Sequence, residues 1–324
     1  MSGTRGPLAV VTDCRHGRVD EELAVLGPLG VELRVADCRS PGDVAEACAE
    51  ADAVLLDMAP MDAAAIASLK RCKVISRYGV GLDNVDLAAA AAAGIEVRNV
   101  PGYCDEEVAS HALAMLLALA RDLPARDRGV RMGGWNLPGR LLSVSGATVG
   151  VAGFGGTGRA FCRMALALKP ARLAVWSPSL TEAGLRSELG SLAGLLGVRL
   201  EAVGFERLLE VSDFLSLHLR LTDGTRGLLG RDALSRCKPG AILVNASRGA
   251  LVDEAALADA LAGGRLGGAG LDTPPVEPPD PGSPLLCVPN LLLSDHCAYR
   301  SDRSISELKR RCAENAAAGL GLGA

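Results

Sequence analysis

Short apolar runs alternate with amphipathic stretches along most of this chain. In its first third, four runs rich in Val, Leu and Ile predict buried strands, at residues 8–12, 31–36, 53–57 and 73–77. The amphipathic stretches 43–51 and 61–69, which lie between these runs, predict helices. Strands and helices in alternation are typical of a parallel sheet with crossover helices.

A second series of the same kind begins near residue 147. Its predicted strands lie at residues 147–153, 172–176, 213–219, 241–246 and 268–272. Two such series predict an α/β fold with two doubly wound parallel-sheet domains. The chain length of 324 residues allows each domain its own core.

The segments between and after the two series carry further signals. Residues 105–123 combine an acidic first turn with many Ala, Leu and Met residues, and Pro124 follows, so we expect one long helix that links the domains. The Gly- and Arg-rich stretch 128–140 is expected to form a loop or arm, in which Trp135 slightly favours an interface over a solvated loop. The capped stretch 301–320 predicts a terminal helix that packs on the first domain.

Composition narrows the functions that this fold can serve. Hydrophobic residues make up 49% of the chain but aromatic residues only 3%, so the cores must be built from Ala, Leu and Val. The net charge of -4 gives no electrostatic reason to expect nucleic acid or an anionic membrane as partner. No apolar run reaches the roughly 20 residues of a membrane span. The first residues lack the features of a signal peptide, so we expect a cytoplasmic protein.

Ten cysteines are scattered singly between Cys14 and Cys312, without a Cys-x-x-Cys pair. This spacing predicts neither a metal site nor a disulfide framework. We interpret most of these cysteines as small buried hydrophobic residues. Cys297 differs because it adjoins His296, and it is either a reactive thiol or, as we favour, a residue that lines a pocket.

A glycine-rich segment opens the second series. Gly153-x-Gly155-x-x-Gly158 follows a predicted strand and begins a predicted helix, the context in which this pattern binds the pyrophosphate of a dinucleotide. Gly153 allows a tight turn, Gly155 lets the backbone approach the pyrophosphate, and Gly158 allows the helix to pack closely on the strand. Free amides at the start of the helix would then face the anion. The alternative is a glycine-rich turn without a ligand.

The strand after the glycine segment lacks the acidic residue that usually binds the adenosine ribose. Ser177 occupies the position where a carboxylate would repel the 2′-phosphate of NADP. No arginine follows directly to bind that phosphate, although Arg220 in a later loop is a candidate to approach the adenosine from the other side. We therefore predict NAD as the cofactor, with NADP also usable.

The chain has four histidines: His16, His111, His218 and His296. His296 is the strongest candidate for acid–base chemistry, because it follows a predicted strand at the carboxyl edge of the sheet, where open α/β folds bind ligands. Arg248 and Glu277 also follow predicted strands at this edge. A carboxylate beside an imidazole favours the protonated form, which suits a proton donor to a developing alkoxide. The alternative for His296 is a buried structural histidine.

Together these motifs resemble the D-isomer-specific 2-hydroxyacid dehydrogenase family, which includes phosphoglycerate and glycerate dehydrogenases. The resemblance covers nearly the whole chain, in the family's order, and within the family it is greatest to the branch of the C-terminal-binding-protein corepressors. The segments that carry it are SRYGVGLDNVD (76–86), NVPGYCDEEVASHALAMLLALAR (99–121), VGVAGFGGTGRA (149–160), SLHLRLTDGTRGLL (216–229), KPGAILVNASRGALVDEAAL (238–257), GGAGLD with VEP (267–278) and NLLLSDHCAY (290–299). The resemblance implies a flavodoxin-like substrate domain, residues 1–101 and 297–324, with an inserted Rossmann cofactor domain, residues 102–296.

The resemblance also implies roles for particular residues. His296 would be the general acid/base, Glu277 its partner, and Arg248 the residue that binds the substrate carboxylate and polarises the carbonyl. Amides of the loop Tyr78, Gly79, Val80 and Gly81 would bind the same carboxylate. The implied cofactor-binding positions are Gly153, Gly155, Gly156, Thr157, Gly158, Ser177, His218, Ala246 and Asp272, the last of which would hold the nicotinamide carboxamide. The implied activity is the interconversion of a 2-oxo acid and a (D)-2-hydroxy acid, by a homodimer that associates through its cofactor domain.

Several positions depart from the family pattern. Asp295 stands where the family usually has Pro before the catalytic histidine, and its carboxylate either favours the protonated form of His296 further or points to solvent. Ser177 replaces the usual Asp, and Arg220 replaces a common Pro. The Pro-rich segment 273–282 varies the loop that carries Glu277. These changes bear on the choice of cofactor and substrate.

Two other functions are compatible with the same residues. The chain could be a cofactor-sensing binding protein, like the corepressors, in which the fold serves as a redox-gated interaction surface. It could also be a dehydrogenase of an unusual small donor, such as formate or phosphite. The presence of Arg248, Glu277 and His296 does not separate these functions, but the compact chain favours a metabolic enzyme.

Overall fold

The computed structural model describes residues 6–288 and 290–323. The chain forms two compact units. The first consists of Met1–Tyr103 and Arg300–Ala324, and the second of Cys104–Tyr299. The second unit is thus inserted between two segments of the first, and both are α/β units with parallel sheets, as the pattern predicts.

The first unit is built on a five-stranded parallel sheet. In order across the sheet, its strands are β2 (Glu32–Val35), β1 (Leu8–Val11), β3 (Ala53–Leu56), β4 (Val74–Arg77) and β5 (Glu96–Arg98). This is the order of flavodoxin-like sheets, in which the direction of winding reverses between the first and third strands. Strands β1 and β3 are buried throughout, which explains why their sequences are continuous apolar runs. The pattern does not predict β5, because this edge strand is short and carries two charged residues.

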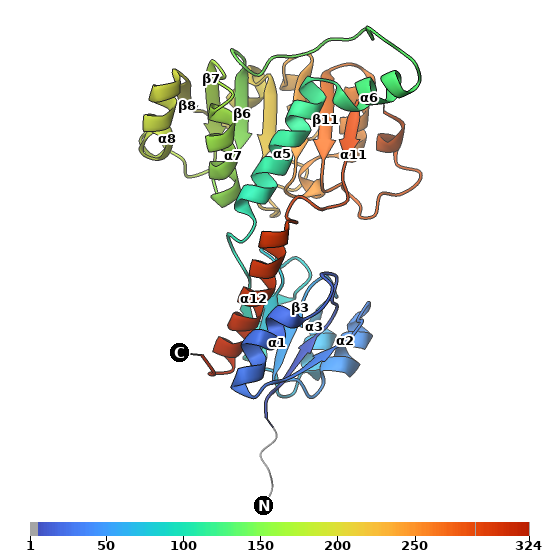
Figure 1. Ribbon diagram of the computed structural model, residues 1–324, viewed down its shortest axis with the longest axis vertical. Coiled ribbons are helices and arrows are strands. Elements are labelled where there is room, and N and C mark those ends of the chain that lie inside the picture. The colour runs from blue at the N-terminus through green and yellow to red at the C-terminus, as the bar shows by residue number, and fades with distance from the viewer. Residues whose placement is uncertain (1–5, 289, 324) are drawn as a thin grey trace, which may run out of the picture. The chain divides into compact units, whose positions relative to one another are not determined.

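Helices cover both faces of this sheet (Figure 1). They are α1 (Asp20–Leu26), α2 (Pro41–Cys48), α3 (Ala63–Ser68), α4 (Leu87–Ala92) and α12 (Asp302–Gly319), with the 3₁₀ turn η1 (Gly27–Leu29) after α1. Alternate strand residues enter different cores: Val10 and Val54 belong to the cluster with α2 and α3, whereas Ala9 and Leu55 belong to that with α1 and α12. Helix α12 packs on α1, β3 and β4, so the terminal helix lies on the first series, as predicted.

The second unit is built on a seven-stranded parallel sheet. In order across the sheet, its strands are β12 (Leu291–Leu293), β11 (Leu266–Leu271), β10 (Ala241–Asn245), β9 (Phe214–Leu217), β6 (Thr148–Ala152), β7 (Arg172–Trp176) and β8 (Arg199–Ala202). The winding reverses between β6 and β9, and such a reversal opens a ligand-binding crevice at the carboxyl ends of the strands. The pattern does not predict the edge strand β8, in which only Leu200 is buried.

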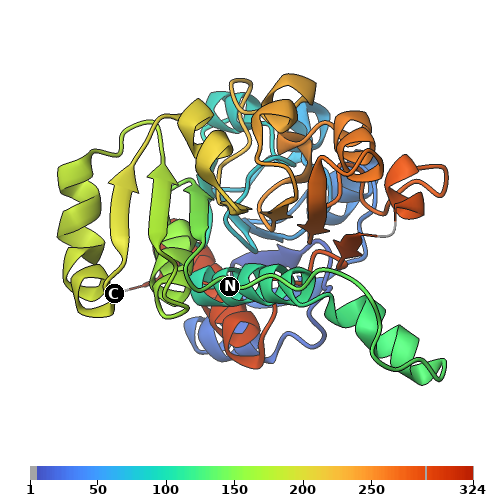
Figure 2. The same ribbon diagram turned by 90° about the horizontal axis from the view of Figure 1, so that it is seen from above.

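Two layers of helices cover this second sheet. Helices α5 (Asp105–Ala120), α7 (Gly156–Leu166) and α8 (Glu182–Leu196) share one core, and α9 (Phe205–Val211), α10 (Arg231–Arg236) and α11 (Glu254–Ala262) share the other. Figure 2 shows the teal helix α5 and the green helix α7 on one side of the sheet and the orange helix α11 on the other. The 3₁₀ turns η2 (Gly249–Leu251) and η3 (Pro284–Cys287) complete the unit.

The helix predicted at 105–123 is present, but it is shorter than expected. Helix α5 ends at Ala120, and a second helix, α6 (Leu123–Arg131), follows at an angle of 57°. Asp122 between them adopts a left-handed φ of 51°, and Pro124 lies in the first turn of α6, where proline favours the start of a helix. Part of the expected loop 128–140 is therefore helical.

Helix α5 belongs to the second unit. It packs on α7, β10 and β11 within the second unit, where Ala109, Ala112 and Ala120 are fully buried. Among the described residues, no single helix has the length and apolar character of a membrane span; the bent pair of α5 and α6 meets those two criteria only when taken together.

Candidate functional site

The glycine segment forms a tight turn between β6 and α7. Gly153 has a φ of +103°, and a Cβ atom there would lie 2.1 Å from the His218 carbonyl oxygen. A Cβ atom at Gly158 would lie 2.2 Å from the Gly153 carbonyl oxygen. Only glycine fits at these two positions, which brings the first turn of α7 close to the strand.

The start of α7 has the features of a pyrophosphate cradle. Gly155, its N-cap, has no side chain to occupy the first amides, and a Cβ atom there would meet no other atom within 4 Å. This open space beside unpaired helix amides fits a dinucleotide phosphate. Gly156 and Thr157 follow, and both contact Asp105 at the start of α5. The Thr157 hydroxyl donates to the Asp105 carboxylate at 3.0 Å, and a Cβ atom at Gly156 would collide with that carboxylate.

His218 and Ala246 lie at the ends of the neighbouring strands β9 and β10. The His218 ring packs on Phe161 at 4.9 Å, and its Nε2 lies 2.9 Å from the Ser216 hydroxyl. Burial lowers the pKa of His218 to about 3, so the ring is neutral. The His218 side chain therefore packs against the glycine turn and places no charge near a bound ligand. Ala246 is buried.

A polar cavity of about 280 Å³ lies beyond the end of β7. Ser177 lines it together with Phe154, Arg159 and Glu188. Arg220, the arginine considered from the sequence, does not line this cavity.

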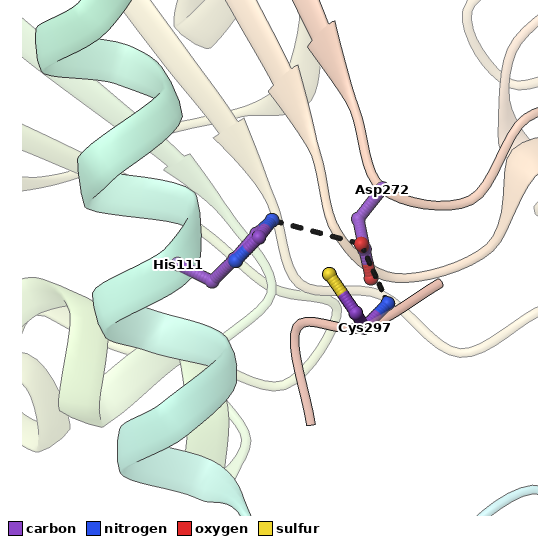
Figure 3. A group of neighbouring side chains, drawn as sticks. All are labelled: His111, Asp272 and Cys297. Atoms are coloured by element: carbon purple, nitrogen blue, oxygen red, sulfur yellow. Dashed lines mark hydrogen bonds and ion pairs between the residues drawn. The ribbon is translucent and has the colours of Figure 1, made fainter. Parts of the chain in front are cut away.

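Asp272, directly after β11, is the centre of a hydrogen-bond cluster. Its side chain is almost fully buried, and its Oδ1 accepts from the Ser294 hydroxyl at 2.6 Å and from the Cys297 amide at 2.9 Å. Its Oδ2 accepts from the Ala298 amide at 3.0 Å. His111, which points from α5 toward Asp272 in Figure 3, has its Nε2 3.0 Å from the same serine hydroxyl. Asp272 thereby fixes the loop that carries residues 294–298.

The side chains of His111, Asp272 and Cys297 also offer ligand atoms within 4.8 Å of one another. Hydrogen bonding accounts for their arrangement, because protein donors already occupy most of the Asp272 acceptor sites. Burial, followed by a hydrogen bond to Asp295, raises the pKa of the Cys297 thiol. The protonated thiol is a poor metal ligand. The carboxylate of Asp295 thus contacts Cys297 and does not simply point to solvent.

His296 and Glu277 form a direct pair. The His296 Nδ1 lies 2.6 Å from the Glu277 Oε2, and both side chains are about one-third exposed, at 35% and 36%. His296 adopts a left-handed φ of 53°, and its amide donates to the Asp272 carbonyl oxygen at 2.9 Å. This tight turn at the end of β12 directs the imidazole toward the loop that follows β11. Both residues follow predicted strands at one sheet edge, and the structure brings them into contact.

Arg248 follows β10, the strand beside β11. Its carbonyl oxygen accepts from the Asn245 side-chain amide at 2.8 Å, and its Nη1 donates to the Ser247 carbonyl oxygen at 2.8 Å. A Cβ atom at Gly249 would lie 2.1 Å from the Pro274 carbonyl oxygen. Glycine therefore lets the Arg248 loop touch the Pro-rich loop that leads to Glu277. Arg248, Glu277 and His296 thus follow three adjacent strands at one edge.

The loop of residues 78–81 lies after β4 in the first unit. Tyr78 is buried, and its hydroxyl donates to the Glu22 Oε1 at 2.7 Å. The Tyr78 amide donates to the Leu56 carbonyl oxygen and the Gly79 amide to the Arg77 carbonyl oxygen. Of the four predicted amides, those of Val80 and Gly81 make no backbone hydrogen bond within residues 6–288 and 290–323. The Asn99 side chain holds the loop through the Val80 carbonyl oxygen at 2.7 Å.

Sequence reasoning missed a second histidine–carboxylate pair, in the first unit. His16 and Asp57 have side chains only 5% and 6% exposed, with Nε2 and Oδ2 3.4 Å apart. Burial, and then the neighbouring charge of Asp13, raises the pKa of Asp57 to about 6. Burial, and then the positive charge of Arg300, lowers the pKa of His16 to about 4. The available signal was an aspartate at the end of each of two predicted strands, Asp13 after β1 and Asp57 after β3.

This chain is similar to known proteins in sequence and in fold. Residues 113–298 match the sequence model of a family described as D-isomer specific 2-hydroxyacid dehydrogenase, NAD binding domain. The chain is 39% identical over 268 residues to a D-3-phosphoglycerate dehydrogenase of Mycobacterium tuberculosis, which covers 82% of this chain and 48% of that protein. The chain thus spans about half the length of the curated relatives of this name that it matches.

Two further matches each cover most of this chain and most of the matched protein. A glyoxylate reductase of Korarchaeum cryptofilum is 39% identical over 261 residues, which is 79% of this chain and 75% of that protein. A solved glyoxylate reductase from Paecilomyes thermophila has a TM-score of 0.84 and 27% identity, over 98% of this chain and 96% of that chain.

Proposed function

The chain belongs to the D-isomer-specific 2-hydroxyacid dehydrogenase family, and from this premise we propose that it interconverts a 2-oxo acid and a (D)-2-hydroxy acid. The observation that carries the proposal is the His296–Glu277 pair, joined at 2.6 Å at the carboxyl edge of the sheet. An imidazole tied to a carboxylate and partly open to its surroundings is suited to pass a proton to a ligand.

The second unit would hold the cofactor, and a bound nicotinamide dinucleotide would supply or accept the hydride. The first amides of α7 would bind its pyrophosphate, since no side chain caps them. Asp272 would accept from the carboxamide group through Oδ2, which receives only the Ala298 amide among the hydrogen bonds described for it. Gly153, Gly158 and the neutral His218 would shape the turn beneath the pyrophosphate.

His296 would donate the proton when the ketone is reduced. An ionised Glu277 is an acceptor only, so the Nδ1 of His296 carries a hydrogen toward it. Nε2 is then the nitrogen that gives its proton to the alkoxide oxygen as hydride reaches the carbonyl carbon. In the oxidation direction, Nε2 takes the hydroxyl proton. Glu277 stabilises the protonated ring that both directions require.

Arg248 would bind the substrate carboxylate and polarise the carbonyl. Its planar guanidinium presents paired donors that match a carboxylate. In the first unit, the amides of Val80 and Gly81 are the ones left to bind that carboxylate, since those of Tyr78 and Gly79 already donate within the unit. We therefore propose that the first unit contributes to substrate binding.

We also infer a homodimer that associates through the second unit. Met132 and Trp135, after α6, are 82% and 79% exposed, and large apolar side chains at such exposure favour an interface. Ten free cysteines suit the reducing cytoplasm, where we expect the protein to work.

The test is a spectrophotometric assay of NADH and NADPH consumption with glyoxylate, pyruvate, hydroxypyruvate and bulkier or phosphonylated 2-oxo acids. We expect turnover with at least one acid, and a loss of kcat of about 10²–10⁴-fold in His296→Ala. Cofactor binding, followed by fluorescence titration, should persist in this variant. Dinucleotide binding by the wild-type protein without turnover of any acid would instead favour a cofactor-sensing protein or an unusual donor.

A further inference from the structure

The polar cavity beyond β7 lies where a fold of this kind binds the adenosine end of a dinucleotide. It encloses about 280 Å³ beside Ser177, the first residue after β7. Three serines, Ser177, Ser179 and Ser187, line it together with Phe154, Arg159 and Glu188. In folds of this kind, the ribose that carries the 2′-substituent lies at the end of the strand after the glycine turn. The assignment of this cavity to a dinucleotide rests on the proposed function.

One cation and one anion face each other in this cavity. Arg159, on α7, packs over the Phe154 ring at 4.8 Å, and its Nε lies 3.5 Å from the Glu188 Oε1 on α8. The two side chains are 39% and 47% exposed, so water screens their attraction. The buried Arg159 Nε has no hydrogen-bond partner in the described part of the chain. Glu188 therefore holds the guanidinium only loosely.

A ribose 2′-phosphate has the chemistry to replace Glu188 as the ion-pair partner of Arg159. The phosphate carries about two negative charges near neutral pH and three strong acceptor oxygens, whereas Glu188 carries one charge. Guanidinium and phosphate form paired charge-assisted hydrogen bonds. The serine hydroxyls are neutral donors that fit the same group. A carboxylate fixed at the end of β7 would oppose this binding, but that position holds Ser177.

We propose that Arg159 binds the 2′-phosphate of NADP(H). The negative charge of Glu188 on α8 opposes the binding of that phosphate, so NAD(H) can still compete for the site. Together Arg159 and Glu188 set the cofactor preference of this protein. The sequence alone does not indicate this pair, because Arg159 belongs to the glycine segment and Glu188 lies on a different helix. Arg220 has no part in the site, since it does not line the cavity.

Arg163 offers a matched control. It lies on α7 one turn after Arg159, but its Nη2 pairs with Glu106 Oε1 at 2.8 Å and it does not line the cavity. Arg163→Gln removes the same charge from the same helix without touching the proposed phosphate ligand.

The experiment is isothermal titration calorimetry of the full chain with 2′,5′-ADP and with 5′-AMP, which differ only in the 2′-phosphate. We expect wild-type protein to bind 2′,5′-ADP more tightly. Arg159→Gln should lower the ratio of the two affinities about tenfold, and Arg159→Lys should restore part of it. Glu188→Gln should raise the ratio by about threefold to tenfold. Arg163→Gln should leave it unchanged.

A pH series adds a readout that a structural role would not affect. The second pKa of a phosphate monoester lies near 6. The advantage of 2′,5′-ADP should therefore shrink as the pH falls through about 6 in wild type, and be flat in Arg159→Gln. Thermal melting of each variant checks that it is folded.

Two results with the paired nucleotides would overturn this proposal and leave the proposed function intact. One is an affinity ratio that Arg159→Gln leaves unchanged, and the other is a ratio that Arg163→Gln lowers equally. Binding of NAD with no advantage for the 2′-phosphate in any variant would have the same meaning. If neither nucleotide nor dinucleotide binds, the proposed function fails as well. Additional calorimetric titrations of the wild-type protein with NAD and with NADP tell these cases apart.

Discussion

This protein contains two histidine–carboxylate pairs of the same chemistry in opposite surroundings. His296 and Glu277 are about one-third exposed and lie 2.6 Å apart. His16 and Asp57 are about 95% buried, with side-chain exposures of 5% and 6%, and lie 3.4 Å apart, beyond the usual hydrogen-bond range. Each pair lies at the carboxyl edge of a parallel sheet.

The comparison shows that surroundings decide what such a pair can do. Burial lowers the pKa of His16 to about 4 and raises that of Asp57 to about 6, because a charge is costly away from water. At neutral pH the His16 ring is therefore uncharged and lacks the imidazolium proton that a general acid donates. His296 is about one-third exposed and lies beside a carboxylate, so its ring can reach a ligand.

The largest expected effect comes from removing the charge of the exposed pair. Glu277→Gln keeps the shape of the side chain but removes the carboxylate that stabilises a protonated His296. We expect kcat for 2-oxo acid reduction to fall by about 10²–10³-fold, with cofactor affinity little changed. Steady-state kinetics with the best acid of the substrate panel measures the effect.

Glu210→Gln is the control for this variant. Glu210 lies on α9 and pairs with Arg207 at 3.3 Å at the surface. The Glu210→Gln variant should have a kcat within about twofold of the wild-type value. Wild-type turnover in Glu277→Gln would show that the pair does not carry the proton, and the contrast with the buried pair would lose its meaning.

The buried pair should affect stability, with opposite pH dependence for its two members. The folded-state pKa of Asp57, about 6, lies above its usual value of 3.8, so its contribution is present below pH 3.8 and is lost as the pH rises through 6. The folded-state pKa of His16, about 4, lies below its usual 6.5, so its contribution is present above pH 6.5 and is lost as the pH falls through 4. Between pH 4 and 6 the two effects offset each other.

Single substitutions separate these effects. In Asp57→Asn only the His16 dependence remains, so stability should fall on acidification from about pH 6.5 to 4, by roughly 3 kcal/mol at most. In His16→Gln only the Asp57 dependence remains, so stability should rise over the same change, by a similar amount. Urea unfolding at several pH values measures both slopes. Equal slopes in the two variants would contradict the assignment of the two pKa shifts.

Prediction from sequence succeeds where the signal is local. Apolar runs locate the inner strands, and the strand ends then place Arg248, Glu277 and His296 at one edge. The short edge strands β5 and β8 are not predicted, because charged and apolar residues alternate in them. Helix α6 is not predicted, because Pro124 is expected to end the preceding helix but lies in the first turn of a new one.

Properties that depend on distances between elements could not be predicted. The contact of Gly249 with Pro274 and the placement of Glu188 beside Arg159 join residues far apart in the chain. The burial of His16 depends on how its loop folds over β1 and β3, which no pattern in its own segment reveals. Sequence reasoning therefore found the exposed pair and missed the buried one.

The smallest expected effect concerns Cys297, the neighbour of His296. Burial and a hydrogen bond to Asp295 raise the pKa of its thiol, so it should react slowly with iodoacetamide at pH 7. Cys287, which is exposed, is the internal reference and should be alkylated about tenfold faster or more, as peptide mass spectrometry can measure. Cys287→Ser checks the peptide assignment. Faster alkylation of Cys297, abolished in His296→Ala, would instead reveal a thiolate–imidazolium pair. His296 would then share its proton with sulfur as well as with Glu277, and the exposed pair would no longer be a simple counterpart of the buried one.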